Sequence, residues 1–306
     1  MEVPCQLGEG LVRPLGDRNA LWWVDIKSSR IFRQELGSHG QRVIERWDCP
    51  TFLTAILDVQ FNREGVEVLA VGGVGHDAGL IKTQLKFGTS QATATKLLSA
   101  PEELEPNERF NDGNWGPDGR FYCGTMDAAE QQAFGRLFAI SFADEGVEQW
   151  CQIDPIPKND QLYGVTNGPV FFGGSMYHND SQAQRIYQFS FNAQSGSWVD
   201  KRVFFQFGLG DGFPDGMCVS EQGILYVAMW NGSCIERFDL MSLSTSKRLS
   251  AVKVPAQNPT RPCLSECGTA IFTTSALAEV SLTANQDNEG NVPAADGGLL
   301  KIELED

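Results

Sequence analysis

Polar–glycine pairs recur along this chain at positions that resemble one another, and they constrain its fold more than any other feature. Each of the last three pairs is followed by a segment of similar sequence, in which a polar turn leads into an apolar run typical of a strand. A repeated unit with an oxygen-bearing side chain at one fixed place can direct those side chains at a common axis, and oxygen donors that converge suit a hard divalent cation. The pairs are Glu9-Gly10, Asp112-Gly113, Asn167-Gly168 and Asp215-Gly216.

The apolar strand centres recur at intervals of about 46 to 55 residues, a spacing typical of propellers and repeat arrays. Several repeats contain a hairpin, such as Trp23–Ile26 followed by Arg30–Arg33. The aspartates at these hairpin turns, Asp25, Asp180 and Asp239, are expected to accept hydrogen bonds from nearby backbone amides. The strand centres are Trp22, Val68, Tyr122, Tyr177, Tyr226 and Phe272.

Six such units predict an all-β protein, a six-bladed β-propeller of four-stranded blades around a central metal channel, formed by residues 1–306 as one domain. An eight-stranded barrel or two stacked sandwiches would also be rich in strands, but neither predicts the recurrent polar–glycine register. A ring must also close. We expect the C-terminal run 298–304 and the N-terminal run 3–7 to share a blade, which covers otherwise exposed edges.

The charge balance excludes some partners. A formal net charge of −15 and a pI near 4.6 argue against binding to nucleic acid or an anionic membrane, which need basic patches.

The eight cysteines form no CxxC pair and are expected to pack in the core. The start of the chain lacks the pattern of a signal peptide and no apolar run is long enough to span a bilayer, so a cytoplasmic protein is expected.

Five short motifs then occur in the order found in one family. The chain resembles the gluconolactonase and regucalcin (senescence marker protein) family from about Glu9 to Phe238, and more weakly to its end. This resemblance implies a six-bladed propeller that holds a divalent metal in its central channel and that, in many members, hydrolyses sugar lactones. The motifs are Gly8-Glu9-Gly10, Arg109-Phe110-Asn111-Asp112-Gly113, Gly124-Thr125-Met126, Asn167-Gly168 and Pro214-Asp215-Gly216-Met217-Cys218.

The resemblance also implies roles for particular residues. Glu9, Asn167 and Asp215 match the metal ligands of the family, and Arg109 and Asn111 match its substrate-contacting pair. A further acidic contact, found in some members shortly after the Gly-Thr-Met motif, has no clean counterpart. The matching position is Ala129, with Glu130 beside it and Asp127 nearer the motif.

The residue types suit this chemistry on their own terms. Two carboxylates and an amide oxygen favour Ca²⁺, Mg²⁺ or Mn²⁺, while Zn²⁺ and Fe²⁺ stay open. Three protein ligands leave coordination positions for water and substrate. Asp215 is expected to act as the general base as well as a ligand, and the guanidinium of Arg109 suits both sugar hydroxyls and a carboxylate product.

Two adjacent residues compete for one position. Matching the repeats by register selects Asp112 as the counterpart of Asn167 and Asp215, whereas the family resemblance selects Asn111. Because neighbouring residues of a strand point to opposite faces, only one of them is expected to face the channel. We expect Asn111 to face it and Asp112 to brace the adjacent loop.

The expected function is metal-dependent hydrolysis of a small sugar lactone, such as glucono-, xylono- or arabinonolactone, in carbohydrate catabolism. Two alternatives stay open at this point. The same site on the same fold could act on organophosphate esters, or the chain could be a non-catalytic calcium-binding or scaffold propeller. A Ser-His-Asp triad is not expected, because the three histidines are widely scattered.

Overall fold

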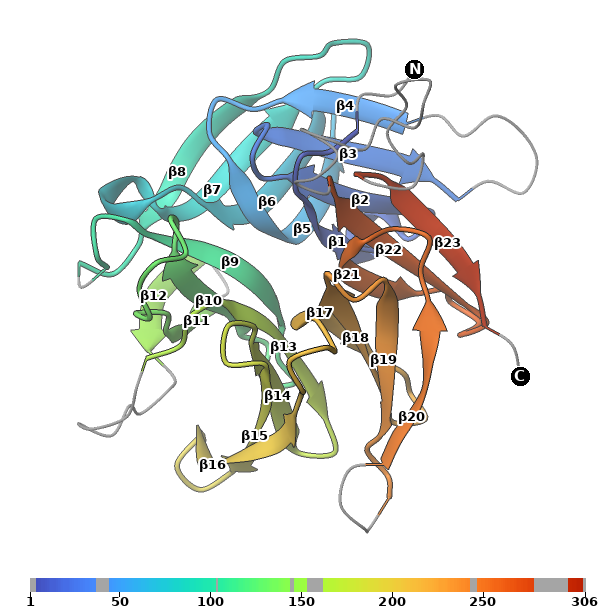
Figure 1. Ribbon diagram of the computed structural model, residues 1–306. Helices are drawn as coiled ribbons and strands as arrows, with labels where there is room; N and C mark the ends of the chain where they lie inside the picture. The colour runs from blue at the N-terminus through green and yellow to red at the C-terminus, as the bar shows by residue number, and fades with distance from the viewer. Residues whose placement is uncertain are drawn as a thin grey trace.

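The chain folds into six antiparallel sheets arranged as the blades of a propeller (Figure 1). The computed structural model describes residues 4–36, 44–102, 104–143, 146–152, 162–242, 247–277 and 297–304. Within these ranges there is no α-helix, and the only helical turns are two short 3-10 turns. The predicted all-β six-bladed propeller is therefore confirmed. The sixth blade has three strands among the described residues instead of the predicted four.

Each blade is a meander in which consecutive strands pair with one another. The 3-10 turns are η1 (Leu15–Asp17) and η2 (Gly75–Asp77). The strands of the six blades, in chain order, are β1 (Gly8–Val12), β2 (Ala20–Asp25), β3 (Arg30–Glu35) and β4 (Ile44–Asp48); β5 (Leu53–Asn62), β6 (Gly65–Gly72), β7 (Gly79–Leu85) and β8 (Thr93–Ser99); β9 (Glu108–Trp115), β10 (Phe121–Asp127), β11 (Leu137–Ala143) and β12 (Gly146–Gln152); β13 (Thr166–Phe172), β14 (Ser175–Asp180), β15 (Arg185–Asn192) and β16 (Ser197–Gln206); β17 (Phe213–Val219), β18 (Ile224–Trp230), β19 (Cys234–Asp239) and β20 (Lys247–Lys253); and β21 (Asn258–Leu264), β22 (Ala270–Ala276) and β23 (Leu299–Glu303).

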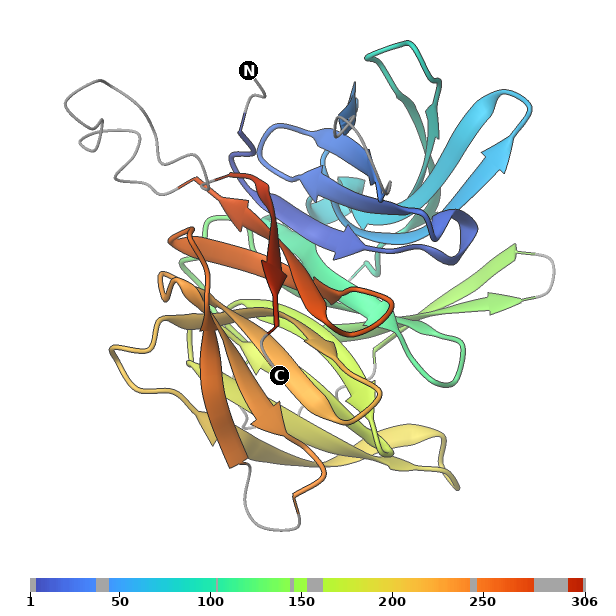
Figure 2. The same ribbon diagram turned by 90° about the vertical axis from the view of Figure 1, so that its right-hand side faces the viewer.

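The two ends of the chain close the ring, as predicted. Strand β23 adds to the last blade beside β22, Leu7 forms an antiparallel bridge with Ala276, and the Cys5 amide donates to the Gly297 carbonyl at 2.7 Å. The Asp25 carboxylate holds this segment by accepting hydrogen bonds from the backbone N–H groups of the two residues before β1. Figure 2 shows the N-terminal strands (blue) beside the C-terminal ones (red).

The predicted hairpins and their capping aspartates are confirmed. Strands β2 and β3 pair antiparallel, as do β14 with β15 and β18 with β19. Asp180 accepts hydrogen bonds from the Gly164 and Ala183 amides, and Asp239 accepts one from the Met241 amide. These bonds fix the turn between β14 and β15 in the fourth blade and the turn after β19 in the fifth.

The packing between blades holds the ring together. Trp22 and Trp47 of the first blade are stacked with centroids 6.0 Å apart, and they join Val59 and Val68 of the second blade in one buried cluster. Because each blade is apolar on both faces, every blade buries one face against each neighbour.

The innermost strands β1, β5, β9, β13, β17 and β21 surround the hub (Figure 1), and the pairing of each with the next strand is interrupted by a register shift. The polar–glycine pairs lie at four of these irregularities. Gly10 (φ +60°) and Gly168 (φ +86°) adopt backbone conformations that favour glycine. A bulge breaks the strict alternation of side chains, so adjacent polar residues can both be buried near the hub.

Across the described ranges, the structure contains no helix with the length and apolar character needed to cross a membrane.

Candidate metal centre

The five residues predicted for the site lie around one cavity of about 350 Å³ at the hub. Glu9 comes from β1, Arg109 and Asn111 from β9, Asn167 from β13 and Asp215 from β17. Four blades thus contribute to one cavity, although the first and last of these residues are far apart in the chain. Each of the five is no more than 7% exposed.

Two of these side chains are buried carboxylates, and burial is the main cause that raises the pKa of each. Burial raises the pKa of Glu9, and the nearby Asp112 carboxylate adds to the effect. Burial also raises the pKa of Asp215, with repulsion from Glu9 as the next cause. The backbone N–H groups of Gly10 and Gly216 partly offset these effects, and neither carboxylate forms an ion pair within the described ranges.

The amide of Asn167 is held in one orientation. Its nitrogen donates to the Ser181 hydroxyl at 2.9 Å, and its oxygen accepts a bond from the Asn111 side-chain nitrogen at 3.0 Å. Asn111 also donates to the Thr166 carbonyl at 2.8 Å. The two asparagines therefore form a fixed pair of amides on the wall of the cavity.

Arg109 lies beside this pair. One of its guanidinium nitrogens donates to the Asn111 side-chain oxygen at 2.8 Å and to the Phe110 carbonyl at 2.9 Å. Burial lowers the pKa of Arg109, and the carboxylates of Glu130, Glu9 and Asp215 oppose this effect. The guanidinium is thus a buried cation that bonds to neutral groups, with donors left for a ligand.

Asp112 takes a different position from Asn111. It does not line the cavity, and its carboxylate accepts hydrogen bonds from the backbone N–H groups of Gly113 and Gly168 and pairs with Arg261 of β21. Although burial alone lowers the pKa of Arg261, the Asp112 carboxylate raises it overall. Asn111 therefore faces the cavity, while Asp112 braces the neighbouring innermost strand rather than a loop.

The donor set fits a divalent cation. Burial raises the pKa of both Glu9 and Asp215, and repulsion from Glu9 raises that of Asp215 further, so a cation beside these carboxylates would offset the cost of burying their charges. In the described part of the chain no group of three His, Cys, Asp or Glu side chains is arranged to hold a metal ion. A site here therefore needs the amide oxygen of Asn167 as its third donor, and oxygen donors suit hard cations.

Other side chains around the cavity were not predicted. Ser181, Gln182, Lys27, Phe213 and Trp230 all line it, and no sequence motif marks them. Only their positions could have indicated them: four lie in or beside a hairpin turn, and Phe213 lies two residues before Asp215.

The two acidic residues near the Gly-Thr-Met motif separate into different roles. Glu130 lines the cavity with a positive φ of 58°, and its carbonyl accepts a hydrogen bond from Gln182 at 2.9 Å. Asp127 caps the same loop by accepting bonds from the Ala129, Gln131 and Gln132 amides.

His178 does not serve as a catalytic base. It is fully buried and packs edge-on against Tyr163 with ring centroids 4.6 Å apart. Burial lowers the pKa of His178 to about 3, and the nearby Lys201 ammonium adds to this effect, so the ring stays neutral at physiological pH.

The sequence is also similar to those of known proteins. A family model described as the SMP-30/gluconolactonase/LRE-like region matches residues 7–276. A pentonolactonase of Haloferax volcanii is 26% identical over 99% of this chain and 93% of its own length. The regucalcin of Sus scrofa is 29% identical over 85% of this chain and 79% of its own length.

Solved structures show the same fold. A calcium-binding protein, regucalcin, from Agrobacterium tumefaciens superposes with a TM-score of 0.74 at 20% identity, over 99% of this chain and 92% of the other. A luciferin-regenerating enzyme gives a TM-score of 0.73 at 20% identity, over 97% of this chain and 91% of the other.

Proposed function

Because the chain belongs to the SMP-30/gluconolactonase/LRE-like family, we propose that it is a lactonase that hydrolyses a small sugar lactone at the hub cavity with the help of one divalent metal ion. Glu9, Asn167 and Asp215 would hold the ion. The observation that carries this proposal is that all three, together with Arg109 and Asn111, line one buried cavity. The names of the relatives agree with it, since one is a pentonolactonase.

A bound divalent cation would polarise the lactone carbonyl and stabilise negative charge on its oxygen. The other requirements of the reaction fall to the protein's own side chains. Water must be deprotonated as it adds to the carbonyl carbon, and the ring oxygen must gain a proton as the ring C–O bond breaks. The product is an open-chain hydroxy acid.

Asp215 is the proposed group for both proton transfers. Burial and repulsion from Glu9 raise the pKa of Asp215 in the metal-free site, and a bound cation would offset part of this effect, so Asp215 would combine the roles of ligand and base. It takes a proton from the attacking water and returns that proton to the leaving ring oxygen.

Arg109 and Asn111 are proposed to orient the substrate. Their side chains bond to each other at 2.8 Å, so a sugar hydroxyl or the product carboxylate would meet a fixed arrangement of donors and acceptors. The charge of Arg109 is buried and forms no ion pair with a described carboxylate. It would therefore favour an anionic product more strongly than an exposed arginine.

The test is a pH-drop assay with gluconolactone, xylonolactone and arabinonolactone, the last two because a pentonolactonase is among the relatives. The protein is treated with chelator and then given Ca²⁺, Mg²⁺, Mn²⁺ or Zn²⁺ in turn. We expect acceleration above spontaneous hydrolysis that chelator removes and a divalent ion restores. Asp215→Asn should lower the rate by at least about 100-fold, whereas Asp77→Asn, in the exposed turn η2, should not change it.

The same experiment tests the alternatives. Tight calcium binding without chelator-sensitive hydrolysis of any lactone would refute the lactonase and favour a calcium-binding propeller. An organophosphate ester, hydrolysed faster than every lactone, would move the assignment to an esterase on the same site. Wild-type rates in the Asp215→Asn variant would remove that residue from its proposed role.

A further inference from the structure

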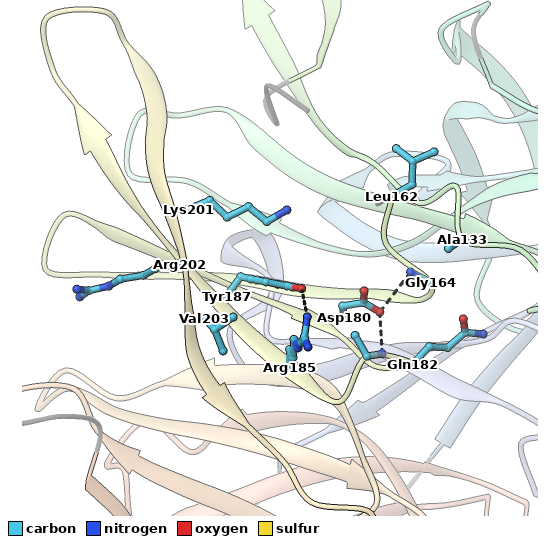
Figure 3. Close-up of a pocket in the computed structure, with 11 residues that line it drawn as sticks. Ala133, Leu162, Gly164, Asp180, Gln182, Arg185, Tyr187, Lys201, Arg202 and Val203 are labelled. Atoms are coloured by element: carbon cyan, nitrogen blue, oxygen red, sulfur yellow. Dashed lines mark hydrogen bonds between the residues drawn. The ribbon is translucent and has the colours of Figure 1, made fainter. Parts of the chain in front are cut away.

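A second, larger cavity of about 610 Å³ lies beside the fourth blade (Figure 3). Its wall is formed by the turn between β14 and β15, the strand β16 and the segment before β13. The described lining carries three basic side chains, Arg185, Lys201 and Arg202, against one acidic side chain, Asp180. This local excess of positive charge stands out in a chain with a formal net charge of −15.

The arginines of this cavity bond to neutral groups. Arg185 donates to the Gln206 side-chain oxygen at 2.5 Å and to the Tyr187 hydroxyl at 3.5 Å, and Arg202 donates to the Gln188 side-chain oxygen at 2.8 Å. Neither forms an ion pair with a described carboxylate, whereas Arg33, Arg136 and Arg261 all do. An arginine that bonds only to neutral groups keeps its charge available for an anion. Arg109 at the hub is in the same situation.

The lysine of the cavity is held by two aromatic rings. The Lys201 ammonium lies 4.4 Å from the centroid of Tyr163 and 4.8 Å from that of Tyr187. Such cation–π contacts orient the side chain while leaving its positive charge in place. In Figure 3 Lys201 extends alongside Tyr187 in the direction of its hydroxyl, Arg185 lies on the other side of Tyr187, and Arg202 points the opposite way.

The acidic residue is already engaged by the backbone. One Asp180 oxygen accepts hydrogen bonds from the Gly164 and Ala183 amides at 3.2 and 3.3 Å, both within the wall of the cavity. Its carboxylate thus caps the hairpin turn. The groups directed at the space are Lys201, Arg185 and the Tyr187 hydroxyl.

We propose that this side cavity, formed around Arg185, Tyr187 and Lys201, binds a small phosphate-bearing anion. Two cations with a hydroxyl between them suit a dianion, and the guanidinium fork suits two oxygens of one phosphate group. The cavity is large enough for a phosphorylated sugar or sugar acid. The site does not depend on a metal ion.

The side cavity adjoins the hub cavity. Gln182 lines both cavities, its neighbour Ser181 lines the hub cavity, and its neighbour Ala183 lines the side cavity. An anion bound here would therefore lie next to the candidate metal centre, separated from it by one hairpin turn.

The test is calorimetric titration of inorganic phosphate into chelator-treated protein at low ionic strength, with acetate as the monoanion for comparison. We expect saturable phosphate binding that is tighter than acetate binding. Arg185→Gln and Lys201→Met should each weaken it by at least about tenfold. Arg185→Lys, which keeps the charge, should retain most of the affinity, and circular dichroism checks that each variant is folded.

Two further variants locate the binding. Lys253→Met removes the same charge from exposed strand β20, away from this cavity, and should leave phosphate affinity unchanged. Asp215→Asn, at the hub, should also leave it unchanged. The absence of saturable binding, or an equal loss in Lys253→Met, would overturn the proposal. Phosphate binding that survives Arg185→Gln and Lys201→Met would overturn it as well.

Discussion

The side-chain nitrogen of Asn167 donates a 2.9 Å hydrogen bond to the Ser181 hydroxyl, and this bond fixes which end of the amide faces Asn111. The same hydroxyl donates to the Pro214 carbonyl at 2.6 Å. Asn179, two residues earlier, donates to the Asp215 carbonyl at 2.6 Å. Strand β14 and its turn therefore link two proposed metal ligands that lie on neighbouring blades.

Removal of the Ser181 hydroxyl should weaken metal binding without unfolding the protein. In Ser181→Ala the Asn167 amide loses the partner that orients it, so we expect divalent affinity to fall by about tenfold. Ser181→Thr, which keeps the hydroxyl, should restore it, and Ser195→Ala in an exposed turn serves as the control. Isothermal titration with Ca²⁺ or Mn²⁺ measures the change. Unchanged affinity in Ser181→Ala would contradict this account of the hydrogen bond.

Neutralisation of Glu9 should have opposite effects on the metal-free and metal-loaded protein. Burial raises the pKa of Glu9 to about 8, so near pH 7 the folded metal-free protein must bind a proton that the unfolded chain does not, and Glu9→Gln should raise its free energy of unfolding by at least about 1 kcal/mol. The same change removes a proposed ligand, so a divalent ion should no longer raise the melting temperature. Thermal unfolding with and without chelator measures both effects.

The control for this prediction is Glu64→Gln, which removes the same charge at an exposed turn. It should leave both the metal-free stability and the metal-induced shift as in the wild type. A Glu9→Gln variant that keeps the full metal-induced shift would remove Glu9 from the ligand set.

The blades followed from the spacing of the strand centres, and the five predicted residues of the hub cavity followed from the family motifs, which include the polar–glycine pairs on the innermost strands of four blades. At Asn111 and Asp112, strand alternation alone does not predict which side chains are buried. The register shift between β9 and β10 lies at this pair of residues, and both side chains are buried. Alternation describes a regular strand and fails at a bulge.

Contacts between blades were beyond a reading of the sequence. Arg261 pairs with Asp112 although 149 residues separate them, and no local pattern around Arg261 indicates this partner. Ser181 reaches Asn167 only because the β14–β15 turn folds back toward the hub. Such pairs depend on the three-dimensional spacing of the blades, which the repeat length alone does not give.

The exposed thiol of Cys267 should react in a pH range lower than that of an ordinary cysteine. Its sulfur lies 2.9 Å from the Thr269 hydroxyl and 3.5 Å from the Ser265 hydroxyl, and these contacts lower the pKa of Cys267 to about 7. Alkylation by iodoacetamide, followed by mass spectrometry, should therefore accelerate between pH 6 and pH 8 with a midpoint near that pKa.

Thr269→Ala removes the main contact and should move this midpoint upward, because the thiolate loses its strongest hydrogen bond. Cys123 is fully buried, and burial raises the pKa of its thiol, so it should stay unmodified in folded protein. A midpoint that does not move in Thr269→Ala would show that the hydroxyl does not stabilise the thiolate.

Gly216, the residue after Asp215, packs against Arg261, the partner of Asp112 in a buried ion pair. A β-carbon at this position would lie 2.7 Å from the Arg261 Cδ atom and 2.8 Å from the Thr260 carbonyl oxygen. In Gly216→Ala either β21 or the adjacent Asp215 must shift, and we expect a loss of about 1–3 kcal/mol of unfolding free energy together with weaker divalent binding. The matched control is Gly210→Ala, because a β-carbon there meets no atom within 4 Å. Urea unfolding and calcium titration of the two variants measure the difference, and equal behaviour of both would show that the glycine after Asp215 is not required by the packing of Arg261.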